Sequence, residues 1–317
     1  MTEPPRATAP SWDVVTFGEA MALLLAEPGV PLPEATAFRR TVAGSESNVA
    51  VGLARLGHRV GWFGRVGDDA FGQVVLRALR GEDVDTSRVR VDPDAPTGLL
   101  VRDCHGQRPV DVLYYRSGSA GSRLATEDVD PDYIRAARLL HLTGITPVLS
   151  DAAHEATAQS VEIARAAGVP ISFDPNIRRR LAEPDLAREV MRPLAAAAQI
   201  VLAGADEAEL LTGKPDAGWF LDQGAELVVI KNGAEGSWAT DGTTTWRQDA
   251  IAVQALDPVG AGDAFAAGFL DGRLTGADVP ECLRRGAALS AQVVQIVGDT
   301  EGLPRDHTAG VAGEVRR

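Results

Sequence analysis

Short apolar runs alternate with helix-like segments through the second half of the chain. The runs begin at Leu139, Ile171, Ile200 and Leu227. Successive starts lie 32, 29 and 27 residues apart, and segments 152–167 and 186–198 between them are typical of helices. Alternation at about 30 residues per unit indicates βαβ crossovers and a parallel sheet. Because ligands of such sheets bind beyond the carboxyl ends of the strands, we expect the chemistry in the loops that follow them.

The first half has the same elements but is interrupted twice. Strands are predicted at 13–17 and 60–63, and helices at 48–56 and 69–79. The stretch at about 20–43 is rich in proline, and the stretch 97–116 is typical of a β-hairpin around Gly106. We predict that both form a small β-sheet lid, inserted into a single α/β domain (1–317) and placed to cover a site. Residues 1–11 are predicted to be a flexible tail.

Charge and cysteine content narrow the class of partner. The net charge of −13 argues against a nucleic acid or an anionic membrane as partner, because both favour a basic face. An anionic small substrate stays open, since a few local arginines can bind one. No run of about 18 apolar residues occurs, so no membrane span is predicted. Cys104 and Cys282 are the only cysteines, which favours a reducing compartment and a cytoplasmic location.

The strongest motif is Asp257 to Phe269, DPVGAGDAFAAGF. Its glycines precede a helix of small and apolar residues and would let the backbone approach a ligand closely. The first amides of a helix lack intrahelical partners, so this segment suits a phosphate or a developing anion. Asp263 in the first turn would repel a phosphate, but it suits a base that takes a proton from an attacking hydroxyl. The alternative is an ordinary capped helix whose glycines serve packing.

A second glycine-rich helix start lies near the N-terminus, in the segment 43–72. Gly44 precedes a predicted helix, and the side-chain amide of Asn48 could bond both the backbone and a sugar hydroxyl. The alternative is a capped helix followed by a turn.

Together, the two motifs resemble the two signatures of the ribokinase-like (PfkB) carbohydrate kinases, and the resemblance runs from Val14 to about Pro304. Segments 114–120, 141–147 and 174–178 are similar to family members that phosphorylate 2-keto-3-deoxygluconate. The resemblance implies a three-layer α/β/α fold, a β-sheet lid and a cytoplasmic homo-oligomer joined through the lids. It implies ATP-dependent phosphorylation of a sugar acid, with 2-keto-3-deoxygluconate and its 6-phosphate favoured. It also implies Mg²⁺ and leaves a monovalent-cation requirement open.

The resemblance assigns roles to individual positions. Asp263 would be the general base, with an anion hole from the amides of Gly260, Ala261, Gly262 and Asp263. The residues expected to face the sugar acid are Gly44, Asn48, Tyr115, Arg116 and Arg178. On the nucleotide side we expect Lys231, Gly233 and Gly236 beside Gly260 and Gly262, with Glu207 holding the metal through water.

Arg178 also has support from its position, because it follows a predicted strand at the ligand end of the sheet. Arg179 and Arg180, which continue the run, are expected to face solvent. Two alternatives stay open. The protein could be a fructokinase-like or ribokinase-like kinase of a neutral sugar, or a non-catalytic sugar-binding regulator.

Three positions depart from the family pattern. Gly204 and Ala287 stand where the family often has asparagine, which affects the metal and adenine sides. Leu100 aligns with a frequent tyrosine and removes one hydroxyl from the expected sugar pocket. Neither a G-x-x-x-x-G-K-[ST] loop nor a G-x-G-x-x-G dinucleotide motif after the first strand is present, which excludes two other nucleotide-binding readings.

Overall fold

The computed structural model describes residues 10–104 and 110–305. The predicted flexible tail therefore lies outside the described residues, apart from its last two positions, and so does the centre of the predicted hairpin at Gly106.

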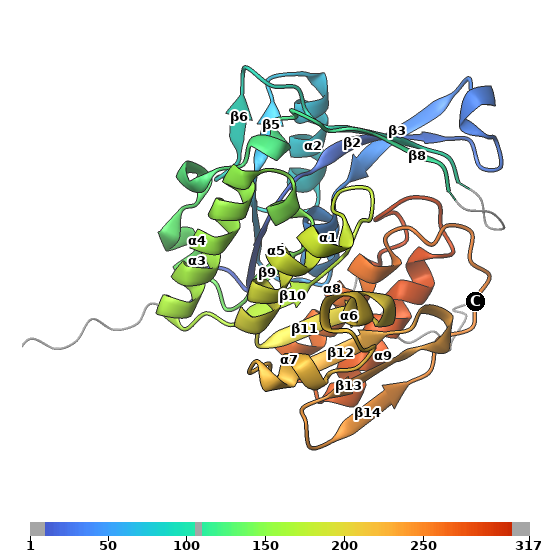
Figure 1. Ribbon diagram of the computed structural model, residues 1–317. Helices are drawn as coiled ribbons and strands as arrows, with labels where there is room; N and C mark the ends of the chain where they lie inside the picture. Colours follow the sequence, from blue (N-terminus) through green and yellow to red (C-terminus); the bar gives the residue numbers. More distant parts are fainter. Residues whose placement is uncertain (1–9, 105–109, 306–317) are drawn as a thin grey trace, which may run out of the picture.

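A long, mostly parallel sheet forms the middle of the molecule (Figure 1). Its strand order is β14 (Thr245–Gln248), β13 (Ser237–Thr240), β12 (Leu227–Lys231), β11 (Ile200–Gly204), β10 (Ile171–Asp174), β9 (Leu140–Thr143), β1 (Val14–Phe17) and β4 (Val60–Phe63). Strands β12 to β4 run parallel, while β13 and β14 are antiparallel additions at one edge. The parallel strands are almost entirely buried, as expected for a sheet covered on both faces.

Helices cover both faces of this sheet, which gives three layers. One hydrophobic core lies between the sheet and the helices α3 (Pro131–Arg135), α4 (Asp151–Ala167), α5 (Pro184–Ala197), α6 (Ala205–Thr212) and α7 (Gly218–Asp222). A second core lies on the other face, under α1 (Ser45–Arg55), α2 (Ala70–Gly81), α8 (Ala261–Leu274) and α9 (Val279–Val293). Among the described residues, no helix is long and apolar enough to cross a bilayer.

Short polar signals in the sequence set the helix ends. Asp69 caps α2, because its Oδ1 accepts a hydrogen bond from the amide of Gly72 at 2.7 Å. α4 begins after Ser150, whose hydroxyl accepts from the amide of Ala153, and it ends at Gly168 in the left-handed region (φ 69°). The predicted helix at 48–56 begins three residues earlier than expected, at Ser45, because Gly44 is its N-cap.

The two segments that interrupt the alternation form a separate small sheet. It has the order β3 (Phe38–Ala43), β2 (Met21–Ala26), β7 (Leu99–Arg102) and β8 (Val112–Tyr115), and it extends away from the main sheet in Figure 1. β2 pairs with β3, and β7 with β8, in antiparallel fashion, while β2 and β7 are parallel. A separate parallel pair consists of β5 (Arg65–Gly67) and β6 (Arg90–Asp92), and short 3-10 helices lie at 32–34, 121–123, 126–128, 146–148 and 233–235.

Candidate active site

The N-terminus of α8 is the centre of the candidate site. Gly260 caps the helix in the left-handed region (φ 82°), and a Cβ there would lie 2.5 Å from the backbone oxygen of Asp299. Only glycine fits this turn. At Gly262 a Cβ would meet only the Nζ of Lys231, at 3.8 Å, so the backbone is open to a ligand. The first amides of α8 and the helix dipole therefore face open space that suits an anion.

Asp263 lies in the first turn of α8 with its carboxylate held by three donors. The Oγ of Ser45 donates to Oδ1 at 2.7 Å, and the Nδ2 of Asn48 donates to Oδ2 at 2.8 Å. The Nδ2 of Asn176 donates to Oδ1 at 3.2 Å. These donors come from α1 and from the loop after β10, and together they fix the orientation of the carboxylate. Asp263 is buried, with 7% of its surface exposed.

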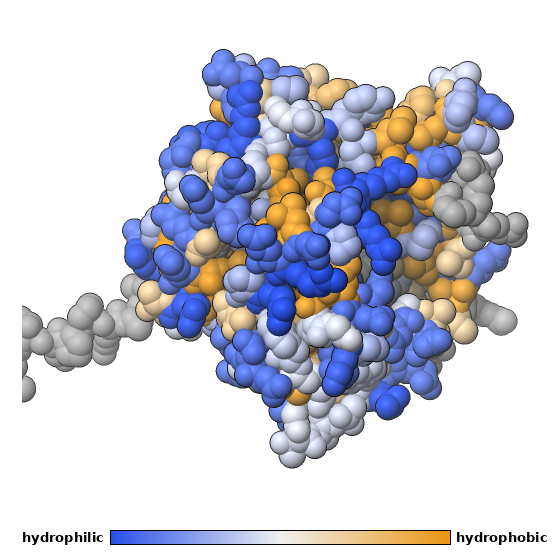
Figure 2. All heavy atoms as spheres, in the orientation of Figure 1, coloured by the Kyte–Doolittle hydropathy of each residue, from blue (hydrophilic) through white to orange (hydrophobic). Residues whose placement is uncertain are grey.

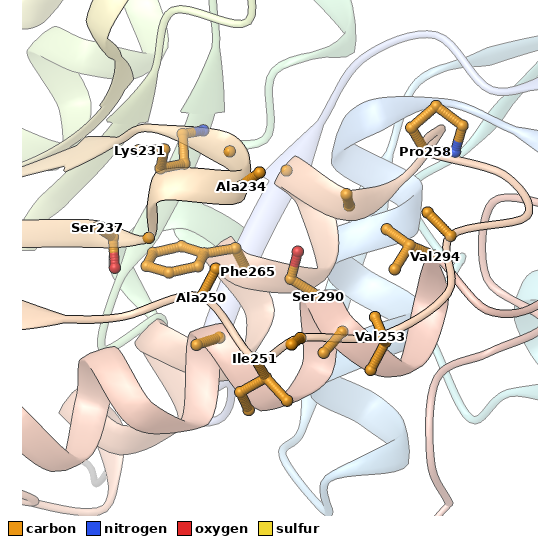
Figure 3. Close-up of a pocket in the computed structure, with 18 residues that line it drawn as sticks. Lys231, Ala234, Ser237, Ala250, Ile251, Val253, Pro258, Phe265, Ser290 and Val294 are labelled. Carbon is orange, nitrogen blue, oxygen red and sulfur yellow. The ribbon is translucent and has the colours of Figure 1, made fainter. Parts of the chain in front are cut away.

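Two cavities meet at this helix start. The larger has a volume of about 590 Å³ and the smaller about 360 Å³, and they share Lys231, Pro258 and Gly262. The larger cavity is mainly apolar (Figure 3), and its wall includes Ala250, Ile251, Val253, Phe265, Ala287, Ser290 and Val294. Gly233 and Gly236 also border it. An apolar slot that ends at an anion-binding helix start suits a planar base with a phosphate tail.

The smaller cavity is polar and contains Asp263. It lies where the surface is hollowed below the small sheet (Figure 2). The main domain contributes Asp174 at the end of β10, Asn176 and Arg178 in the loop after it, and Glu207 in α6. The small sheet contributes Leu100, Arg102, Val112 and Tyr114. A small polar molecule bound here would touch Asp263 on one side and the small sheet on the other.

Lys231 lies where the two cavities join. Its Nζ forms an ion pair with Oδ2 of Asp174 at 2.5 Å. Burial opposes the charge of this lysine, but the carboxylates of Asp174 and Glu207 outweigh it and raise the pKa of Lys231. The side chain therefore keeps its charge at neutral pH. Its Nζ lies 3.8 Å from the position that a Cβ on Gly262 would occupy. It can neutralise a phosphate held between the cavities.

Residues 12–306 match the family described as pfkB family carbohydrate kinase. The chain belongs to this family. Two relatives named 2-dehydro-3-deoxygluconokinase come from Bacillus subtilis (strain 168) and Thermoproteus tenax. The first is 43% identical over 300 residues, 92% of this chain and 92% of the relative. The second is 37% identical over 305 residues, 93% of this chain and 92% of the relative.

The fold agrees with this assignment. The crystal structure of a putative ribokinase II from E. coli, in complex with ATP and Mg²⁺, matches with a TM-score of 0.86 at 26% identity. The match covers 92% of this chain and 96% of that one. The protein is an ATP-dependent carbohydrate kinase with the predicted three-layer α/β/α fold and a separate small sheet.

Several residues predicted for the kinase site do lie together. Asp263, Gly260, Gly262 and Arg178 border the smaller cavity, while Lys231, Gly233, Gly236 and Ala261 border the larger one. Asn48 reaches Asp263 but is absent from both cavity walls, so the structure gives it a supporting position. Gly44 is also absent from both walls, and it lies against the backbone oxygen of Glu19.

Tyr115, a predicted sugar contact, borders neither cavity. Tyr115 is 61% exposed on the outer face of β8, whereas Tyr114 borders the smaller cavity. Neighbouring residues of a strand point to opposite faces of its sheet, so Tyr114 and Tyr115 lie on opposite faces of the small sheet.

Arg116 is also not part of either cavity wall. It is buried, and its Nε and Nη2 contact Oε2 of Glu19 at 2.7 and 2.5 Å. The hydroxyl of Ser119 donates to the other oxygen of Glu19. The guanidinium lies over the ring of Tyr114, 5.6 Å from its centroid. In this structure Arg116 therefore neutralises the buried carboxylate of Glu19 and lies against the ring of Tyr114.

Glu207 borders the smaller cavity, but backbone groups occupy its carboxylate. Oε1 accepts from the amide of Ile177 and Oε2 from the amide of Gly204, both at 2.7 Å. Burial, together with the charge of Asp174, raises the pKa of Glu207. Within the described ranges, no cluster of three or more histidine, cysteine or carboxylate side chains could hold a metal directly. The predicted role through water stays a prediction.

The sequence analysis did not select four residues that lie near Asp263: Ser45, Arg102, Asn176 and Asp299. Asn176 has a positive φ of 43°, a conformation that asparagine tolerates better than most residues. That preference, directly after a buried strand, was the available signal for this position.

Proposed function

We propose that this kinase phosphorylates a sugar acid, with 2-keto-3-deoxygluconate as substrate and its 6-phosphate as product. The observation that carries the proposal is that Asp263 and Arg178 both line the smaller cavity. Among the described residues, Arg178 has no carboxylate partner within 4.0 Å, so its guanidinium is available to a substrate carboxylate. The names of the relatives from Bacillus subtilis and Thermoproteus tenax support this substrate.

The chemistry requires few groups. Asp263 accepts the proton of the sugar hydroxyl, whose oxygen attacks the terminal phosphorus of ATP, and ADP leaves. The amides of Gly260 to Asp263 stabilise the negative charge that develops on the transferred group. Lys231 neutralises the phosphates from the junction of the two cavities. The adenine base occupies the larger, apolar cavity.

Mg²⁺ fits this site through water. Each carboxylate oxygen of Glu207 accepts one backbone amide and has a second lone pair for a water molecule. Mg²⁺ keeps several waters and is bound largely by substrate phosphates, so it needs few protein ligands. When bound, it would supply positive charge beside the phosphates. We leave a monovalent cation outside the proposal.

The small sheet acts as a lid in this proposal, and its outer face is the site of self-association. Its inner face borders the smaller cavity, which we call the sugar cavity, through Leu100 and Tyr114. Its outer face exposes Leu113 (48%) and Tyr115 (61%). Adjacent exposed apolar side chains favour a protein contact. We infer a homo-oligomer in which the small sheets of two copies pack together.

A substrate screen tests the function. ADP release is measured with a panel that contains 2-keto-3-deoxygluconate, 2-keto-3-deoxygalactonate, 5-keto-2-deoxygluconate, fructose and ribose. The proposal predicts the highest kcat/KM for 2-keto-3-deoxygluconate, and phosphorus NMR should place the phosphate on C6. A higher value for fructose or ribose would replace it with the neutral-sugar kinase. Binding without turnover of any sugar would support the non-catalytic regulator.

A further inference from the structure

Arg102 extends from the small sheet into the interior beside the sugar cavity. It is the last residue of β7, it is 1% exposed, and it borders the smaller cavity. Its Nη2 contacts Oδ2 of Asp257 at 2.7 Å and Oδ1 of Asp299 at 3.0 Å. Both carboxylates are buried. The small sheet thus supplies the positive charge between two acids that belong to the main domain, and such a buried arrangement is stable only while all its members are present.

The first of these acids, Asp257, holds the loop that leads into the anion hole. Its Oδ1 accepts from the amide of Val259 at 3.2 Å. Its Oδ2 accepts from the amide of Gly298 at 3.0 Å. Val259 immediately precedes the cap residue Gly260. The position of the first amides of α8 therefore depends on Asp257, and the charge of Asp257 is compensated by Arg102.

The second acid, Asp299, leads to the catalytic carboxylate. Its Oδ2 is 3.5 Å from the Nδ2 of Asn48, the same nitrogen that donates to Asp263 at 2.8 Å. The backbone oxygen of Asp299 also lies against Gly260, where a Cβ would approach it to 2.5 Å. Asp299 thus touches both the support of the base and the turn of the anion hole.

We propose that Arg102 is a positioning residue, which gives Asp263 and the anion hole their working geometry only while the small sheet is docked on the main domain. Without the guanidinium, Asp257 and Asp299 face each other in the interior without a cation. They must then take up protons or turn toward water, and either change displaces the loop 257–260 and Asn48. This arrangement links occupation of the sugar cavity, which the small sheet borders, to readiness for phosphoryl transfer.

The charges around Asp299 agree with this role. Burial is the largest influence and raises the pKa of Asp299 to about 6, Arg102 opposes that rise, and the carboxylates of Asp263 and Asp257 add to it. Removal of Arg102 would favour protonation of Asp299. The neutral carboxyl group would then attract the side-chain amide of Asn48 less strongly.

Three variants of the full-length protein test the proposal. Arg102→Met removes the charge at similar volume, and Arg102→Lys keeps the charge but loses the fork. Arg65→Met is the matched control, because Arg65 is also mostly buried and bound to several acids, Glu127 and Asp128 among them, outside both cavities. kcat and the two KM values are measured with the sugar that the wild-type enzyme phosphorylates best, so the test remains decisive if the proposed substrate is wrong.

We expect Arg102→Met to lower kcat by about 100-fold, the loss that a misplacement of about 1 Å can cause. KM for ATP should change far less than kcat, because most of the wall of the larger cavity lies outside the displaced loop and does not include Arg102. Arg102→Lys should lose less than Arg102→Met, and Arg65→Met should lower Tm but keep kcat. If Arg102→Met does not fold, Arg102→Lys decides by the same split between kcat and KM for ATP.

The proposal is overturned if folded Arg102→Met, or Arg102→Lys in its place, keeps the wild-type kcat. It is also overturned if Arg65→Met loses kcat by the same factor, since the effect would then reflect general loss of stability. Equal losses in the methionine and lysine variants would contradict the role of the positive charge.

Discussion

Asp263 is the proposed general base, and this role can be tested by a single substitution. Asp263→Asn is nearly isosteric and should keep the fold. Without a base, kcat should fall by about 10²- to 10⁴-fold, while ATP affinity holds or rises because a negative charge near the phosphates is lost. Asp271→Asn is the control, because Asp271 is a buried aspartate of the same helix that contacts His58 and Arg285 instead. Near wild-type turnover in Asp263→Asn would remove the assignment.

Asp299 gives a prediction for stability against pH. Its pKa is 3.8 in the unfolded chain and about 6 in the folded protein, where burial dominates over the attraction of Arg102 and the repulsion from Asp263 and Asp257. Between pH 3.8 and about 6, Asp299 therefore takes up a proton when the protein folds. Its ionisation lowers the free energy of unfolding as the pH rises through about 6. Asp299→Asn resembles the protonated form and escapes this cost.

The stability of Asp299→Asn relative to wild type should therefore increase with pH. The full difference amounts to about 3 kcal/mol, at 1.36 kcal/mol per pH unit. Urea unfolding of both proteins at several values between pH 4 and 7.5 measures it. Parallel curves would show that Asp299 titrates normally in the folded protein.

Individual residues could be predicted from the sequence where they lie in a continuous motif or directly after a strand. Asp263 and Gly262 lie in a continuous glycine-rich motif, and Arg178 follows a recognisable strand, so the sequence was enough to predict that they lie close together. Arg102 and Asp299 are 197 residues apart and come together only through the tertiary structure. Tyr114 was missed because its neighbour has the same side chain, and the sequence does not say which of the two faces inward.

At the scale of elements, the N-terminus of α8 is the proposed binding site for the phosphates. Gly262→Val should fold, because a Cβ at this position meets only the flexible end of Lys231. Its branched side chain would fill the space above the amides, so both kcat and the rise of Tm with ATP should fall. Gly81→Val is the control, since Gly81 near the end of α2 has no atom within 4 Å of its Cβ position. Unchanged kinetics in folded Gly262→Val would mean that this glycine serves packing alone.

The small sheet carries the prediction about assembly. The double variant Leu113→Asp/Tyr115→Ser places polar groups on its outer face and should convert the proposed oligomer to monomer. Leu186→Asp, at an exposed leucine on α5, should stay assembled. Light scattering after size-exclusion chromatography measures both. A monomeric wild type, or a double variant of unchanged mass, would exclude self-association through this face.

Most elements were predictable because parallel strands and amphipathic helices repeat with clear periods. The strand at Val60–Phe63 was predicted with its observed ends. Helix starts moved by a few residues where a glycine serves as the cap, as at Gly44, since glycine capping leaves no side-chain signal. The order of strands in the small sheet depends on pairing between β2 and β7, about 75 residues apart, and no local pattern contains that information.

At the scale of the whole molecule, the proposed function requires an acidic protein to bind an acidic sugar. The net charge is −13, so a substrate carboxylate needs a local cation to overcome the general field. Arg178 borders the smaller cavity on the side of the main domain, and it is the residue that we propose for this charge. A neutral sugar has no need of it. The net charge of the whole chain therefore makes a local cation necessary for a charged substrate, but not for a neutral one.

The most direct test compares kcat/KM for 2-keto-3-deoxygluconate and for fructose in wild type, Arg178→Ala and the control Arg179→Ala. A charge-assisted hydrogen bond contributes about 1.5–3 kcal/mol, so Arg178→Ala should lower kcat/KM for the acid by roughly 10- to 150-fold. The value for fructose should change far less, and Arg179→Ala, whose exposed side chain is absent from the cavity wall, should leave both unchanged. Equal losses for both sugars in Arg178→Ala, or a wild-type preference for fructose, would contradict a site built for a sugar acid.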